Sequence, residues 1–254
     1  NKRNARLKME RFLDIPHLPQ GKVRKIMLGE KYRKVLENAL LMHDLQPIWL
    51  KCNKNVDERL SGHCDLMAAH LGGRHLAVLE DKAAQCEQIN NIELLKIKAP
   101  EKPDYPYDAK LNFCIVGDKL IYNPKTADKA AVACLNKVPA ACKQGYTKCS
   151  VCVVDESSII TADAGIARIA EEIGIDVLLV DEKITALDGF EHGFIGGASF
   201  KINRNEMAFT GVINDAAQKL RIESFLNERG ISAVYLTERT LFDIGSAIPI
   251  TEEL

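Results

Sequence analysis

The chain has 254 residues, of which 46% are hydrophobic, and a formal net charge of −1. This length and composition allow a large hydrophobic core in one or two domains, and the balanced charge argues against a nucleic-acid-binding surface, which needs an excess of basic residues. No apolar run reaches the roughly 18 residues of a membrane-spanning helix, and no segment has the pattern of a signal peptide.

Cysteines occur throughout the chain rather than in a dense group. There are eight of them, at Cys52, Cys64, Cys86, Cys114, Cys134, Cys142, Cys149 and Cys152. Small secreted domains instead carry closely spaced cysteines that form a disulfide framework. We therefore expect reduced thiols and a cytoplasmic protein.

The first part of the chain predicts an extension followed by a strand, a helix and a strand. Residues 1–20 are expected to form an N-terminal extension, whose basic residues we interpret as a solvated end. Residues 23–28 and 47–51 have the apolar character of strands, and residues 30–45 between them have helical character.

The next segment has the order hairpin, helix, strand. Two short apolar runs within residues 66–80 are separated by a pair of glycines, which predicts a hairpin. Residues 81–90 have helical character, and residues 92–98 read as a strand.

This order returns three times along the chain. The second unit has a predicted hairpin at residues 111–123 and a helix at 126–137. The third has a hairpin at 150–162, a helix at 162–174 and a strand at 176–180. The fourth has a hairpin at 197–211, a helix at 214–230 and a strand at 232–236. Asp163 and Asn214 are the expected N-caps of the last two helices, and Gly174 and Gly230 are their expected C-terminal stops.

The two ends of the chain predict the halves of a fifth unit. Residues 244–250 have the pattern of a first hairpin strand, and residues 23–28 that of its partner. Pairing them would close a ring, with no open sheet edge, and would make residues 1–254 a single domain. A period of about 40 to 50 residues is typical of radial repeats. The alternative is an ordinary mixed α/β sheet, in which βαβ units give a similar order of elements.

The order of elements resembles the pentein fold, also called the guanidine-modifying fold, over residues 23–253. The fold class that this implies is α/β, a β/α propeller of five pseudo-symmetric hairpin–helix–strand units around a central axis. Four segments resemble a bacterial branch of that fold that lacks the usual C-terminal catalytic cysteine: GHCDLMAAHLGG, QGYTKCSVCVVDESSIITAD, GFEHGFIGGASFKI and DIGSAIPITEE.

The resemblance implies chemistry at the central axis on a guanidine, amidine or related C–N group. In catalytic penteins a cysteine attacks the carbon, a histidine of an H-x-D motif transfers protons, and carboxylates bind the cation. A thiolate is a strong nucleophile, histidine titrates near neutral pH, and carboxylates bind planar cations through charge-assisted hydrogen bonds.

This sequence departs from that pattern in its last hairpin. Pro249 stands where the family cysteine would be, and no cysteine follows Cys152. The histidine of the H-x-D match, His63, also lies earlier in the chain than in the family. If the protein is an enzyme, the nucleophile therefore has to come from another unit.

Four residues are the candidates for catalysis. His63 and Asp65 form the H-x-D match, and Cys149, expected to start a hairpin strand, is the candidate replacement nucleophile. His192 precedes two glycines that allow close backbone approach. The structural alternatives are a His–Asp hydrogen bond at a hairpin base, a buried apolar cysteine and a tight turn.

Glu191, Asp243 and Ser246 are the candidate substrate-binding residues, because they lie beside corresponding turns in the fourth and fifth units. We expect no metal and no cofactor, since adjacent residues rarely chelate one ion and Cys149 and Cys152 would point to opposite faces of a strand. The expected partner is a small polar ligand, with no nucleic acid and no membrane.

Two functional hypotheses remain open. The protein is either a hydrolase or transferase with a cysteine and histidine site at the axis, or a non-catalytic binding protein for a small polar ligand or a protein partner. A meeting of Cys149 and His63 at the axis would favour the enzyme, and their separation would exclude the cysteine mechanism.

Overall fold

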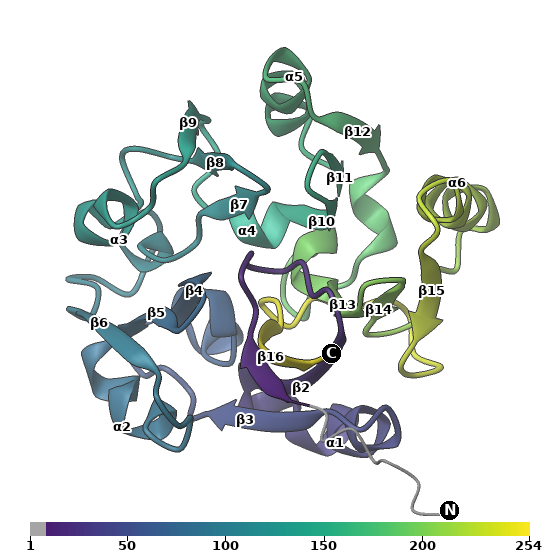
Figure 1. Cartoon of the computed structure of the whole chain (residues 1–254). Coiled ribbons are helices and arrows are strands. Elements are labelled where there is room, and N and C mark those ends of the chain that lie inside the picture. Colours follow the sequence, from purple (N-terminus) through teal and green to yellow (C-terminus); the bar gives the residue numbers. More distant parts are fainter. Residues whose placement is uncertain (1–8) are drawn as a thin grey trace, which may run out of the picture.

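Five small sheets stand around a central axis in the computed structural model, which describes residues 9–254 (Figure 1). Four sheets have three strands each, in the orders β4-β5-β6, β7-β8-β9, β10-β11-β12 and β13-β14-β15. The fifth has four strands, in the order β1-β16-β2-β3. The predicted pentein-type propeller of five units is therefore confirmed.

Each three-stranded sheet is built from an antiparallel hairpin and a third strand that runs parallel to its second strand. In the fifth sheet the antiparallel pair is β16 and β2, and β3 runs parallel to β2. The strands are β1 (Glu10–Phe12), β2 (Lys22–Gly29), β3 (Gln46–Leu50), β4 (Ala68–Gly72), β5 (His75–Leu79), β6 (Glu93–Ile97), β7 (Cys114–Val116), β8 (Lys119–Tyr122), β9 (Val138–Ala141), β10 (Val151–Asp155), β11 (Ser158–Thr161), β12 (Asp176–Leu179), β13 (Ser199–Asn203), β14 (Glu206–Phe209), β15 (Ser232–Tyr235) and β16 (Ile248–Glu253). The helices are α1 (Arg33–Met42), α2 (Ala83–Cys86), α3 (Lys129–Ala133), α4 (Thr147–Ser150), α5 (Ala164–Glu172) and α6 (Ala216–Asn227).

Helix α5 illustrates how the outer layer forms. Its spacing places Ile166 and Ala170 on one face, where they are fully buried in a cluster with Ile159 of β11. Burial of an isoleucine side chain of this kind stabilises the fold by roughly 1.5–3 kcal/mol. The Asp163 carboxylate accepts a hydrogen bond from the Ile166 N–H, which confirms the predicted cap, and Gly174 ends the helix at φ +81°.

Ring closure joins the two ends of the chain. β16 lies between β1 and β2 and is antiparallel to both, with Ile248 opposite Met27. Part of the predicted N-terminal extension thus forms β1, while residues 1–8 of that extension lie outside the described residues. The carboxylate of Glu252, which is 1% exposed, accepts hydrogen bonds from the backbone N–H groups of Gln20 and Gly21.

Two local features differ from the sequence-based expectation. The strand β9 was not predicted, because it is short and contains Pro139; proline is tolerated there because β9 is the edge strand of its sheet. The cap of α6 is Asp215, whose carboxylate accepts from the Gln218 N–H, and the prediction of Asn214 is wrong by one residue.

The first strand of each hairpin lies innermost, around the axis (Figure 1). These inner strands contact one another directly, β7 with β10, β10 with β13, β13 with β16 and β16 with β4. The segments that lead into the inner strands therefore converge at the axis. Within residues 9–254, no helix has both the length and the apolar character needed to cross a bilayer.

Candidate active site

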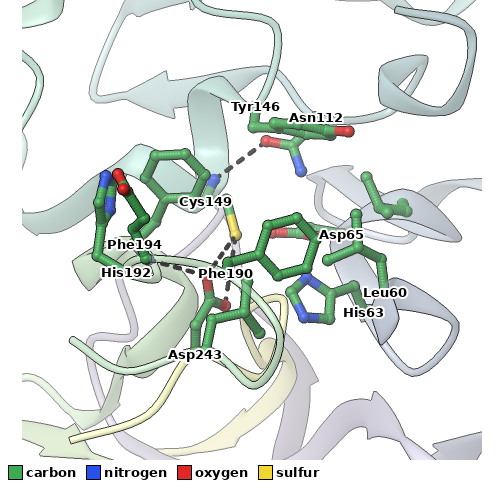
Figure 2. Close-up of a pocket in the computed structure, with 13 residues that line it drawn as sticks. Leu60, His63, Asp65, Asn112, Tyr146, Cys149, Phe190, His192, Phe194 and Asp243 are labelled. Atoms are coloured by element: carbon green, nitrogen blue, oxygen red, sulfur yellow. Dashed lines mark hydrogen bonds between the residues drawn. The ribbon is translucent and has the colours of Figure 1, made fainter. Parts of the chain in front are cut away.

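A pocket of about 350 Å³ opens where the segments leading into the inner strands meet (Figure 2). All five units contribute to it. The lining residues are Leu60, His63, Asp65, Leu66, Asn112, Tyr146, Cys149, Leu187, Phe190, Glu191, His192, Phe194 and Asp243. Six of the seven predicted site residues thus line one pocket, and the seventh, Ser246, does not.

Short helical turns present the polar residues of the first and third units. Asp65 lies in a 3-10 turn, Cys64–Leu66, just before β4. Cys149 lies in α4, and β10 begins only at Val151, so the prediction that Cys149 starts a strand is wrong. The turn forms because the carbonyl of Tyr146 accepts both the N–H and the hydroxyl of Ser150.

The thiol of Cys149 meets a carboxylate and an imidazole. Its Sγ lies 3.5 Å from each carboxylate oxygen of Asp243. A nitrogen of His63, Sγ of Cys149 and a carboxylate oxygen of Asp243 all lie within 4.8 Å of one another. Figure 2 shows the His63 ring beside the other two side chains. Cys149 and His63 therefore meet at the axis, as the enzyme hypothesis required.

Backbone groups hold the Asp243 carboxylate in place. Its two oxygens accept hydrogen bonds from the N–H groups of Gly245, at 2.8 Å, and Phe194, at 2.9 Å. Burial raises the pKa of Asp243 to about 6, although these N–H groups act in the opposite direction. Burial likewise raises the pKa of Asp65 above its usual value.

The imidazole and the thiol are both neutral in the free protein near pH 7. Burial lowers the pKa of His63 to about 4, despite the charge of the adjacent Asp65. Burial raises the pKa of the Cys149 thiol well above its usual value, and the charges of Asp243 and Asp65 raise it further. The nearby Lys148 ammonium acts in the opposite direction on this pKa.

A buried chain of polar groups supports the pocket from behind. The Lys148 ammonium donates to the carbonyl of Gly196 and to the hydroxyl of Ser246, both at 3.1 Å. That hydroxyl lies 3.1 Å from Oδ2 of Asp65. Ser246, predicted to bind substrate, is fully buried and stands behind Asp65 instead of lining the pocket.

Three buried polar atoms in the pocket have no hydrogen-bond partner: Nε2 of His63, Oδ1 of Asp65 and Nδ2 of Asn112. Their residues are each no more than 3% exposed. Buried polar atoms in native proteins are nearly always paired. Three unpartnered polar atoms, in residues that line one small cavity, therefore indicate a place for a polar ligand group.

Glu191 and His192 lie at the rim of the pocket. Glu191 is exposed. The imidazole of His192 is engaged on both sides, through Nδ1 with the carbonyl of Gly193 at 3.0 Å and through Nε2 with Glu182 at 3.4 Å. It thus borders the pocket, while His63 stands next to the thiol.

The sequence-based set missed Asn112, Tyr146 and Lys148. Oδ1 of Asn112 accepts from the Cys149 N–H at 3.0 Å and so anchors α4. Asn112 immediately precedes the second unit's inner hairpin, which is the same place in the repeat that pointed to His63 and Cys149. This position in the repeat could have identified Asn112 from the sequence.

The same donor atoms could hold a divalent cation. Imidazole, thiolate and carboxylate are all zinc ligands, and three protein ligands with one open position are typical of catalytic zinc sites. The unpartnered Nε2 of His63 is compatible with such a role. The expectation that no metal binds stays a prediction.

Comparison with known proteins identifies the family and the fold of this chain. The model of a family described only as a family of unknown function, DUF6873, matches residues 27–248, and no curated protein matches. Similar solved structures include C. jejuni agmatine deiminase with substrate bound, at 13% identity and TM-score 0.52, covering 98% of each chain. The inosamine-phosphate amidinotransferase of Streptomyces griseus is similar at 9% identity and TM-score 0.56, covering 94% of this chain and 97% of that one.

A third similar structure is the Pseudomonas aeruginosa DDAH complexed with citrulline, at 11% identity and TM-score 0.52, covering 92% of this chain and 100% of that one. At such identities the similarity establishes the fold alone. The family match covers most of the chain, and the ring of five units is shared by all three structures. The chain is therefore a member of the DUF6873 family and has the pentein fold.

Proposed function

We propose that this protein is a cysteine-dependent enzyme that breaks a C–N bond of a small guanidinium or amidinium compound. The observation that carries the proposal is the thiol of Cys149, grouped with His63 and two carboxylates in one buried pocket. The similar structures described above include a deiminase and an amidinotransferase, which supports the same class of reaction.

Asp65 and Asp243 are the proposed binding groups for the cationic head of the substrate. A planar cation with several N–H donors can satisfy Oδ1 of Asp65, which has no partner in the free protein. Two adjacent buried carboxylates are costly on their own, so a bound cation offsets their mutual repulsion. The same cation removes much of the electrostatic penalty on a thiolate at Cys149.

In the first step, Sγ of Cys149 forms a bond with the central carbon of the head, and the thiol proton passes to the imidazole of His63. His63 is suited to accept it because its imidazole is neutral and Nε2 has no other partner. The bond from that carbon to the leaving nitrogen then breaks. The leaving nitrogen takes the proton from His63 and departs as ammonia or an amine.

In the second step, water adds to the carbon that is bound to sulfur and gives a proton to His63. The C–S bond breaks as the C=O bond forms, and the sulfur recovers that proton as a thiol. The remaining hydroxyl proton passes to solvent, where the released ammonia or amine takes it up. The product is a ureido compound from a guanidine or an amide from an amidine. An amine in place of water would make the enzyme a transferase by the same route.

In this proposal Pro249 has no catalytic role. It lies in β16, where it pairs with Ile26 of β2 and contributes to ring closure. The nucleophile comes instead from α4 of the third unit, two units away from the position that the family resemblance indicated.

The test compares Cys149→Ser with Cys142→Ser, a matched control at another buried free cysteine that does not line the pocket. Release of ammonia or amine is measured on a panel of guanidino and amidino compounds, with EDTA present to keep the thiol free of metal. We expect Cys149→Ser to lose turnover by on the order of 10³-fold or more and the control to retain it.

Acid-quenched wild-type reactions are analysed in parallel by peptide mass spectrometry. We expect a covalent adduct on the peptide that contains Cys149. Unchanged turnover in Cys149→Ser would overturn the cysteine mechanism. Binding of panel compounds without turnover and without an adduct would instead support the alternative, a non-catalytic binding protein.

A further inference from the structure

The pocket separates into a polar end and an apolar body. The polar atoms of His63, Asp65, Asn112 and Asp243 are gathered at the buried end around the Cys149 thiol. Apart from Glu191 and His192 at the rim, the rest of the lining is aliphatic and aromatic: Leu60, Leu66, Tyr146, Leu187, Phe190 and Phe194. The hydroxyl of Tyr146 donates to Asp108 at 2.7 Å, so this residue offers the pocket its ring and not its polar end.

No lysine or arginine lines this pocket among the described residues, and its charged groups are acidic. Arg59 contacts a lining residue, because its guanidinium lies 4.2 Å from the centre of the Phe190 ring, but this guanidinium already bonds to the Asp57 carboxylate and the Gly189 carbonyl. The ammonium of Lys31 donates to the carbonyls of Glu58 and Arg59.

A carboxylate on the ligand would therefore find no counter-ion in the body of the pocket. Transfer of a carboxylate from water into an apolar site without a partner is strongly unfavourable. At the rim it would meet Glu191, which has the same charge. A hydrocarbon chain or ring, in contrast, gains from burial against leucine and phenylalanine side chains. The volume of about 350 Å³ is at the small end of the range for ligand pockets.

We propose that the substrate is a small guanidinium or amidinium compound with an apolar, uncharged tail, and that compounds with a carboxylate on the tail are excluded. This inference rests on the proposed function, because it assumes that the cationic head lies between Asp65 and Asp243. Leu187 is the residue that sets the selectivity for the tail, since it is a half-buried wall residue close to the rim.

The experiment measures binding by calorimetry at pH 7.5 for n-butylguanidine and 4-guanidinobutyrate, which share a head and chain length but differ in the terminal carboxylate. We expect the wild-type protein to bind n-butylguanidine at least about tenfold more tightly, which corresponds to about 1.4 kcal/mol. Leu187→Lys places an ammonium at the wall and should reduce or reverse this ratio. Leu187→Met, the matched control, should leave the ratio unchanged.

The outcomes distinguish recognition of the ligand's tail from recognition of its cationic head. Equal or tighter binding of 4-guanidinobutyrate by the wild-type protein would overturn the inference on the tail and leave the proposed function standing. If neither compound binds, recognition of the cationic head fails, and the proposed function falls together with the inference. Asp65→Asn should weaken both compounds by a similar factor, because it changes only the contact with the head.

Discussion

At the scale of single residues, the electrostatics of the pocket depend on two buried carboxylates and one buried ammonium. Asp65 and Asp243 line the pocket, and Lys148 stands behind it at hydrogen-bond distance from Ser246. One ammonium cannot neutralise two carboxylates, so the free site favours protonated acids and a neutral thiol. A bound cation supplies the missing positive charge.

This balance predicts how binding of a cation depends on pH. The pKa of Asp243 is raised to about 6, so its carboxyl group is neutral below that pH and charged above it. We expect the affinity for n-butylguanidine to rise about tenfold between pH 5 and pH 7 as Asp243 ionises. His63, with a pKa of about 4, stays neutral over this range and does not contribute.

Calorimetric titrations at half-unit steps of pH would measure this dependence. The Asp243→Asn variant serves as the control: its affinity should be lower at pH 7 and should vary less between pH 5 and pH 7. An affinity of the wild-type protein that stays flat over the same interval would show that Asp243 does not pair with the cation.

At the scale of secondary-structure elements, glycines allow the turns at the axis to approach one another. A Cβ atom on Gly197 would lie 1.9 Å from an Asp243 carboxylate oxygen and 2.7 Å from Cys149 Sγ. A Cβ atom on Gly245, where φ is +68°, would lie 2.2 Å from the Cβ atom of His63. The close grouping of thiol, imidazole and carboxylate therefore depends on these two positions having no side chain.

The cap of α6 gives a prediction at this scale. Asp215 accepts from the Gln218 N–H at 2.9 Å, while the side-chain amide of Asn214 donates to the Thr240 hydroxyl. We expect Asp215→Ala to lower the free energy of unfolding by about 1 kcal/mol. Asn214→Ala, the control at the neighbouring exposed residue, should change it by less than about 0.5 kcal/mol. Urea denaturation followed by circular dichroism measures both, and a larger effect at Asn214 would refute this assignment of the cap.

At the scale of the whole molecule, the C-terminal strand completes the ring. β16 bonds to β1 on one side and β2 on the other, and Ile248 and Ile250 are buried in the core cluster that also includes Met67 of the first unit. The N-terminal and C-terminal parts of the chain thus share one sheet. Loss of β16 would expose this core, leave β1 without a partner strand and turn β2 into an open sheet edge.

Truncation of residues 248–254 tests this role. We expect the truncated protein to lose cooperative thermal unfolding, because removal of a central strand costs more than the 5–15 kcal/mol by which domains are usually stable. Removal of Leu254 alone, which is 61% exposed, is the matched control and should leave the unfolding temperature nearly unchanged. A cooperative transition near the wild-type temperature in the longer truncation would contradict a stabilising role for β16.

The sequence by itself determined the repeat and most of its elements, because hairpin turns, apolar alternation and helix stops are local signals. The predicted hairpin at residues 66–80, for example, corresponds to β4 and β5, and the cap at Asp163 is present. It also pointed to His63, Asp65, Cys149 and Asp243, through their places just before the inner strands.

Only the tertiary structure decided which of these side chains meet. In the structure, Cys149 lies beside His63 and Asp243, and Asn112 lines the same pocket. The ring of His192 is hydrogen-bonded at the rim, and Ser246 lies behind Asp65. Positions within one unit follow from short-range backbone preferences. Distances across the axis instead depend on how five units close into a ring, which no local pattern encodes.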